Sequence, residues 1–175
     1  MPQDARRRAW KKWVCVLAGI VLIAGILFYS IVPKFPQPMY EVDSYEALVQ
    51  ELRGNENIVV PSLEGLPLVD VSCTVVLKSR TGYAKAGYLL SGRTDGDQRR
   101  TLWMDVRILE ENDRPLNQDM LAHGLWAEVD RGDGYCTIKF DWNGTRYLLE
   151  SNDLDAISED ELLNLMKQII EPTEM

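Results

Sequence analysis

The chain of 175 residues has 19 Lys and Arg against 27 Asp and Glu, which gives a formal net charge of −8 at pH 7. Binding to nucleic acid depends on clustered Lys and Arg, so an acidic chain of this kind argues against a nucleic-acid partner. One His and three Cys, at spacings that fit no zinc pattern, predict no metal, no cofactor and no catalytic residue.

The first distinctive feature is an uncharged run of twenty residues from Trp13 to Val32. A helix of this length spans a hydrocarbon core of about 30 Å, whereas a signal peptide has a shorter apolar region and a small-residue cleavage site. Basic residues precede the run and only Lys34 follows it closely, and excess Lys and Arg stay on the cytoplasmic side. We therefore expect a cytoplasmic tail over 1–12, a retained single-pass transmembrane helix over 13–32, and the rest of the chain outside the cell membrane.

A short segment rich in proline follows the uncharged run. Pro33, Pro36 and Pro38 predict a stiff, extended linker over 33–40. The remaining residues, 41–172, are long enough for one compact domain with its own core. Beyond the run there are 14 basic against 26 acidic residues, which is typical of a solvated surface and argues against docking on anionic lipid.

Two helices are expected, one near each end of this domain. In "DSYEALVQELRGN", Asp43 is the expected N-cap and Glu46 its capping-box partner. Apolar residues at helical spacing form one stripe of that helix: Tyr45, Leu48, Val49 and Leu52. The second helix is expected to open at Ser158, with Glu161 completing a capping box, and to end at Pro172.

Between the helices, polar and apolar residues alternate with a period of two, which predicts strands. Six stretches show this pattern: "VSCTVVLKS", "YAKAGYLL", "TLWMDVRIL", "LWAEV", "YCTIKFDW" and "TRYLLE". Asn143-Gly144 between the last two is typical of a type I′ hairpin, and the longest connection is expected to hold a helical turn at Asn117–Ala122. The predicted fold class is α+β, an N-terminal transmembrane helix followed by a two-layer domain. Its mostly antiparallel sheet has about six strands in simple meander order, with the helices of both ends packed on one face.

Cys73 and Cys136 both fall in phase with the apolar face of their strands. They form either a disulfide or two separate buried thiols, which behave as small hydrophobic groups. A disulfide needs Cα atoms within about 7 Å, and the first and fifth strands of a simple meander are not neighbours. This geometry favours free thiols.

Two parts of the sequence carry a resemblance to a known family. They are "VDSYEALVQEL" with "IVVPSLEGLP", and "IKFDWNGTRYLLESNDLDAISEDELLNLMKQII". The pattern resembles a bacterial extracytoplasmic domain of unknown function found C-terminally in membrane-anchored anti-sigma-factor-like proteins. The resemblance covers most of 41–171 and consists of core and turn positions without a catalytic motif. The cytoplasmic anti-sigma domain of those proteins has no counterpart in the twelve residues before the run.

Three aromatic residues are the candidate partner surface. Trp103, Trp126 and Tyr135 are expected on the polar face of adjacent strands, where exposed aromatic rings mark recognition surfaces. The alternative is that a loop, such as 110–122, folds over them.

The sequence as a whole favours a membrane-anchored interaction or sensing module without catalytic activity, with a protein partner at the cell surface. The second reading is a carrier of an apolar ligand held between the sheet and the helices, as in curved-sheet lipoprotein carriers. The third is an enzyme that uses carboxylates, because any acidic protein contains carboxylate pairs.

Overall fold

The computed structural model describes residues 39–78, 84–96, 100–121 and 124–171. The predicted tail 1–12, the predicted transmembrane helix 13–32 and most of the predicted linker lie outside these residues. Within the described ranges, no helix is both long and apolar enough to cross a bilayer. For the described residues the expected architecture is corrected to a sheet and two helices without a membrane-spanning helix.

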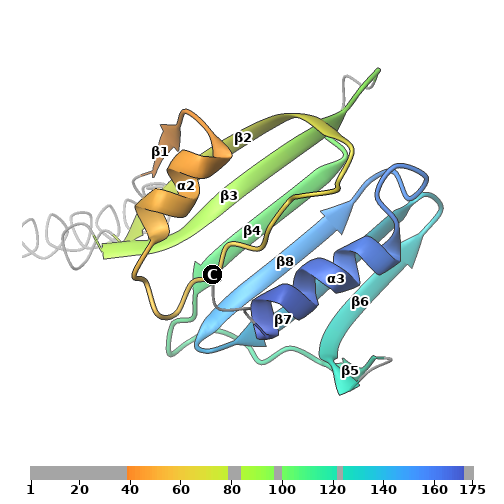
Figure 1. Ribbon diagram of the computed structural model, residues 1–175. Coiled ribbons are helices and arrows are strands. Elements are labelled where there is room, and N and C mark those ends of the chain that lie inside the picture. Colours follow the sequence, from red (N-terminus) through yellow and green to blue (C-terminus); the bar gives the residue numbers. More distant parts are fainter. Residues whose placement is uncertain (1–38, 79–83, 97–99, 122–123, 172–175) are drawn as a thin grey trace, which may run out of the picture. The chain divides into compact units, whose positions relative to one another are not determined.

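The described residues form one antiparallel sheet and two helices (Figure 1). The strands are β1 (Met39–Val42), β2 (Leu68–Lys78), β3 (Ala84–Thr94), β4 (Leu102–Ile108), β5 (Asp119–Met120), β6 (Trp126–Gly132), β7 (Tyr135–Trp142) and β8 (Thr145–Ser151). The helices are α2 (Tyr45–Leu52) and α3 (Glu159–Ile170). Hydrogen-bonded neighbours follow the order β1-β2-β3-β4-β8-β7-β6-β5.

The prediction of six strands is wrong, because the sheet formed by the described residues has eight. β1 begins inside the segment expected to be a linker, and β5 stands where a helical turn was expected at Asn117–Ala122. A strand of two to four residues is too short to show a period of two, so its pairing with a neighbour decides its conformation.

The predicted meander order is also wrong. β4 pairs with β8 rather than with the next strand along the chain, so the chain passes from the middle of the sheet to its far edge at β5. It then returns inward through β6, β7 and β8. Local alternation defines the strands, but it does not define which strands are neighbours.

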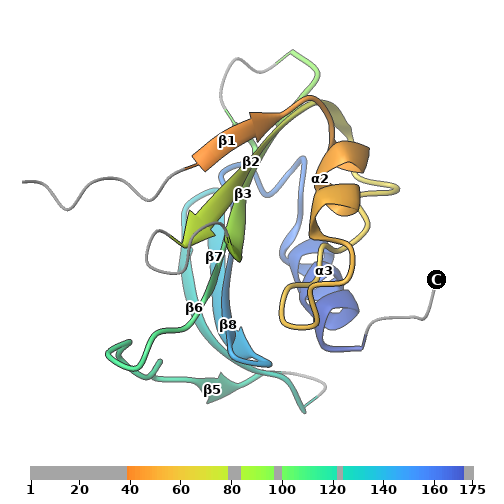
Figure 2. The same cartoon turned by 90° about the vertical axis from the view of Figure 1, so that its left-hand side faces the viewer.

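Both helices lie on the same face of the sheet (Figure 2). Their buried residues are Leu48 and Leu52 of α2, and Leu162, Leu165, Met166 and Ile169 of α3. The capping box predicted for α3 is confirmed: Ser158 Oγ accepts from the backbone N–H of Glu161, and the Glu161 carboxylate accepts from Ser158 N–H at 2.6 Å. The N-cap predicted for α2 is wrong by one residue, because Ser44 Oγ accepts from Ala47 N–H at 3.2 Å in place of Asp43.

The core lies between the helices and the sheet. Its largest buried side chains from the strands are Tyr88, Leu90, Leu102, Met104, Ile138, Phe140, Tyr147 and Leu149. Phe140 and Tyr147 stack across β7 and β8, with ring centroids 5.1 Å apart. Burial of this apolar surface is the main favourable term in the stability of the domain.

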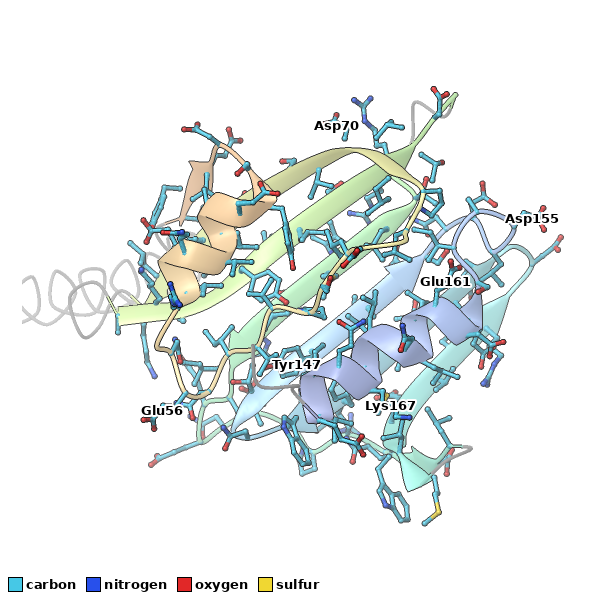
Figure 3. All side chains as sticks on the ribbon, viewed as in Figure 1. Glu56, Asp70, Tyr147, Asp155, Glu161 and Lys167 are labelled. Atoms are coloured by element: carbon cyan, nitrogen blue, oxygen red, sulfur yellow. The ribbon has the colours of Figure 1, made fainter. Side chains whose placement is uncertain are left out.

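An extended connection, 53–67, passes over the core between α2 and β2. Its backbone polar groups need partners because they cover an apolar layer. Tyrosine hydroxyls supply several of them: Tyr147 accepts from Val59 N–H at 3.0 Å, and Tyr88 donates to Val59 O at 3.2 Å. Figure 3 shows Tyr147 under this connection.

Cys73 and Cys136 are both free and almost fully buried. Three strands, β3, β4 and β8, separate β2 from β7 in the sheet, which places the two residues roughly 19 Å apart. A disulfide needs Cα atoms within about 7 Å. The prediction of two separate thiols is therefore confirmed, although the strand order that suggested it was wrong.

Candidate functional site

The face of the sheet turned away from α2 and α3, which we call the outer face, holds the side chains that alternate with the core positions. Its residues on β4, β8, β7 and β6 are Trp103, Asp105, Arg107, Arg146, Leu148, Glu150, Tyr135, Thr137, Lys139, Asp141, Trp126, Glu128 and Asp130. Figure 2 shows the segment between β4 and β5 on this side and both helices on the other.

Trp103 lies on the outer face of β4 and is half-buried. The guanidinium carbon of Arg100 lies 4.3 Å from the centroid of its ring, which is cation–π geometry. Arg100 also pairs with Glu150, which lies opposite Trp103 on β8. Arg100 therefore covers one face of this tryptophan.

Tyr135 is 37% exposed and packs over Gly132, its cross-strand partner on β6. A methyl group at Gly132 would lie 1.9 Å from Cε1 of the Tyr135 ring, so the ring occupies the space that a side chain would fill. Its hydroxyl lies 3.4 Å from the Asp130 carboxylate. Much of the Tyr135 ring thus has a local structural role.

Trp126 is the most exposed of the three predicted aromatic residues, at 52%. Met120 on β5 lies directly opposite it and is 59% exposed. The two form an apolar pair at the edge of the sheet. Glu128 and Asp130, both exposed, follow Trp126 on the same face of β6.

The register shows that the three aromatic residues share the outer face without forming one patch. Trp103 lies in a row with Glu150, Thr137 and Asp130. Trp126 lies three strand spacings from Trp103 and four residues along β6 from that row. The Cα atoms of the two tryptophans are therefore separated by roughly 14 Å across the sheet and roughly 14 Å along it. The candidate partner surface therefore reduces to Trp126 with Met120.

The structure also reveals a pocket that sequence reasoning missed. It lies on the outer face over β4, β8 and β7 and has a volume of about 190 Å³. Its lining residues are Asp105, Arg107, Lys139, Arg146 and Leu148. In the sequence these four charged residues and one leucine lie on three separate strands. They come together only because β4 pairs with β8 and β8 pairs with β7.

Two arginines meet directly across β4 and β8 at one end of the pocket. Arg107 lies opposite Arg146, and like charges in this position repel. Each is neutralised by its own carboxylate: Arg107 by Asp113 at 2.9 and 3.1 Å, and Arg146 by Asp141 at 2.8 and 2.9 Å. Hydrogen bonds from Arg107 lower the pKa of Asp113, and the hydrogen bond with Asp141 raises the pKa of Arg146.

The same arginines hold the segment after β4 against the outer face. Asp113 belongs to this segment, and its carboxylate also accepts from Glu110 N–H at 2.7 Å. Arg146 Nη2 donates to the carbonyl of Arg114 at 2.8 Å. The arginine end of the pocket is therefore tied to the segment that leads into β5.

The other two charged residues of the pocket have opposite sign. Asp105 and Lys139 flank Leu148 on either side, one strand away each. Within the described residues neither forms an ion pair at 4.0 Å or less, and both are half-buried. Burial raises the pKa of Asp105, and the positive charge of Arg107 opposes this effect.

Two further hollows lie near α2. One, of about 440 Å³, is lined mainly by apolar residues, among them Val49, Leu52, Ile58 and Val60. The other, of about 750 Å³, is lined by Glu41, Asp43, Glu46, Glu51 and Lys85. In the second, the Glu51 carboxylate accepts from Tyr40 and pairs with Lys85, so its own neighbours satisfy part of its charge.

No group of three or more His, Cys, Asp or Glu could hold a metal ion in the ranges that the structure describes. Comparison of the chain with known protein families, with curated proteins and with solved structures finds no match.

Proposed function

We propose that the domain formed by 39–171 is a non-catalytic interaction or sensing module that binds a protein partner through Trp126 and Met120. The observation that carries this proposal is the exposure of these two large apolar side chains directly opposite each other at the sheet edge. Exposed tryptophans are enriched among the residues that dominate binding energy at protein interfaces.

The charges beside this pair define the chemistry of the partner. Glu128 and Asp130 lie on the same face of β6 as Trp126, and both are exposed. Complementary charge favours association and suppresses wrong partners. The proposed partner therefore presents an apolar surface bordered by Lys or Arg.

The proposed location of the domain is outside the cell membrane, with the N-terminus in the cytoplasm. This part of the proposal rests on the sequence alone, on the basic residues that precede 13–32. The resemblance to the extracytoplasmic domain of anti-sigma-factor-like proteins supports the same location and the same class of function. Protease added to intact cells is expected to degrade 39–171, and protection of these residues would contradict the location.

Crosslinking in cells tests the proposed contact. A photo-reactive residue at position 126 is expected to capture a protein that Trp126→Ser no longer retains in a pull-down. Trp142→Ser is the matched control, because Trp142 is also exposed, at 41%, but lies in phase with the other face of the sheet. Glu128→Lys is expected to weaken retention of the same protein. Equal loss of the captured protein from Trp126→Ser and Trp142→Ser argues against this surface. Unchanged retention by Glu128→Lys also argues against it.

One observation favours a second function, the binding of an apolar ligand. The hollow of about 440 Å³ beside α2 has mainly apolar walls. The space between sheet and helices is filled by side chains such as Tyr88, Leu90 and Met166, each 0% exposed, so the ligand would sit at the end of α2. Native mass spectrometry of the purified chain tests the binding of an apolar ligand. A lipid that co-purifies with the unchanged chain and is absent from Val49→Asp supports this function.

A further inference from the structure

The pocket on the outer face has an unusual arrangement of charge. Arg107 and Arg146 are each held by a carboxylate, whereas Asp105 and Lys139 face the pocket without a close partner in the described part of the chain. A charged group that is partly removed from water is destabilising unless another charge compensates it. The pocket thus keeps one negative and one positive group ready for an outside partner.

The geometry limits that partner to a small molecule. Asp105 and Lys139 lie on either side of Leu148, two strand spacings apart, so their Cα atoms are roughly 10 Å from each other. They do not reach each other, since no ion pair within 4.0 Å joins them. The volume of about 190 Å³ lies below the range of roughly 300–1,000 Å³ found for pockets that hold drug-sized ligands.

The charges around the pocket exclude a simple anion. Three cations line it, Arg107, Lys139 and Arg146, together with one carboxylate, Asp105. Asp113 and Asp141 pair with the two arginines, which leaves Asp105 and Lys139. An anion alone would leave Asp105 unpaired, and an amine alone would leave Lys139 unpaired.

We propose that this pocket binds a small zwitterion, a free amino acid, with its ammonium group at Asp105 and its carboxylate group at Lys139. The aliphatic part of the ligand lies over Leu148. This inference goes beyond the proposed protein contact, because it uses other residues and holds whether or not Trp126 binds a partner.

Ligand-observed nuclear magnetic resonance with the full chain tests the proposal. Alanine, β-alanine and 4-aminobutyrate, which differ in the separation of their charges, are compared with acetate and ethylamine at equal concentration. At least one of the three zwitterions is expected to bind, and acetate and ethylamine are expected to bind at least tenfold more weakly. Absence of binding by all three zwitterions, or equal binding by acetate or ethylamine, overturns the proposal.

Two substitutions and a matched control assign the site. Asp105→Asn and Lys139→Gln are each expected to weaken binding about tenfold or more, because each removes one charged contact. Glu128→Gln removes the same charge as Asp105→Asn from a residue outside the lining, and binding is expected to change less than about twofold. An equal loss in Glu128→Gln, or no loss in Asp105→Asn with its thermal unfolding still cooperative, overturns the assignment. Trp126→Ser is expected to leave zwitterion binding unchanged, which separates this result from that of the protein contact.

Discussion

The hydroxyl of Tyr147 on β8 accepts a hydrogen bond from the backbone N–H of Val59, 88 positions earlier in the chain, at 3.0 Å. The same hydroxyl donates to the carbonyl of Asn57 at 3.3 Å. Thr145, two residues before Tyr147 on the same face, donates to Asn57 as well, at 2.7 Å. One strand therefore holds the connection between α2 and β2 in place over the core.

Tyr147→Phe is expected to destabilise the domain by about 1–3 kcal/mol, because it leaves the partly buried N–H of Val59 without its acceptor. The stacked ring on Phe140 remains, so loss of packing is small. Urea unfolding measures the change. Tyr135→Phe is the control, since it removes an exposed hydroxyl, and a change within about 0.5 kcal/mol is expected. Equal effects in the two variants would contradict the role of the Tyr147 hydroxyl.

Gly87→Ala is expected to destabilise the domain by about 3 kcal/mol or more, because the added methyl group would lie 1.9 Å from the backbone oxygen of Val106 on β4. Backbone cannot move aside without breaking the pairing of β3 with β4. At Gly132 the three atoms nearest to the added methyl group all belong to the Tyr135 ring, which can rotate away, so we expect a smaller loss for Gly132→Ala. Thermal unfolding compares the two, and a greater loss in Gly132→Ala would contradict this reasoning.

Stability is expected to fall in alkaline solution as pH rises above about 9. Burial raises the pKa of the Cys73 thiol from 9.0 to about 11, and it raises the pKa of Tyr147 and of Tyr88. The unfolded chain therefore releases these protons at lower pH than the folded chain does. The contribution of the protonated Cys73 thiol to the stability of the domain is fully present below pH 9, and it is lost as pH rises through about 11.

Melting temperatures measured from pH 7 to pH 11 test this dependence. Cys73→Ala removes one of the buried groups whose pKa is raised, so the decline between pH 9 and pH 11 should be shallower than in the unchanged chain. An unchanged slope in Cys73→Ala would show that other groups cause the decline.

Asp105→Asn is expected to raise the stability of the domain at pH 7. Burial raises the pKa of Asp105 above its ordinary value of 3.8, so the ionised form is less favourable in the folded than in the unfolded chain. This penalty is fully present at neutral pH and is relieved as pH falls through the pKa of the folded state, so the two proteins should converge in acid. Urea unfolding at pH 7 and pH 4 measures the difference. If Asp105→Asn is less stable than the unchanged chain at pH 7, the expected penalty of the buried charge is absent. If it is more stable, the Asp105 carboxylate lowers the stability of the domain, as residues at many functional sites do.

The sequence by itself determined the local features of this protein. The alternation of residues along the strands placed Tyr88, Ile138 and Leu149 on the buried face, and the pattern at Ser158 and Glu161 defined the start of α3. These features depend on residues at most four positions apart, so a single sequence contains all of the information needed for them.

Only the tertiary structure decided that β4 pairs with β8. The pairing of β4 with β8 brings Asp105 next to Leu148 and Arg107 next to Arg146, and it separates Trp103 from Trp126. The short strand β1 likewise depends on a long-range contact, which is its pairing with β2. A strand with one apolar face fits several positions in a sheet equally well. The position that it takes is decided by the burial of the whole apolar core, to which all strands and both helices contribute.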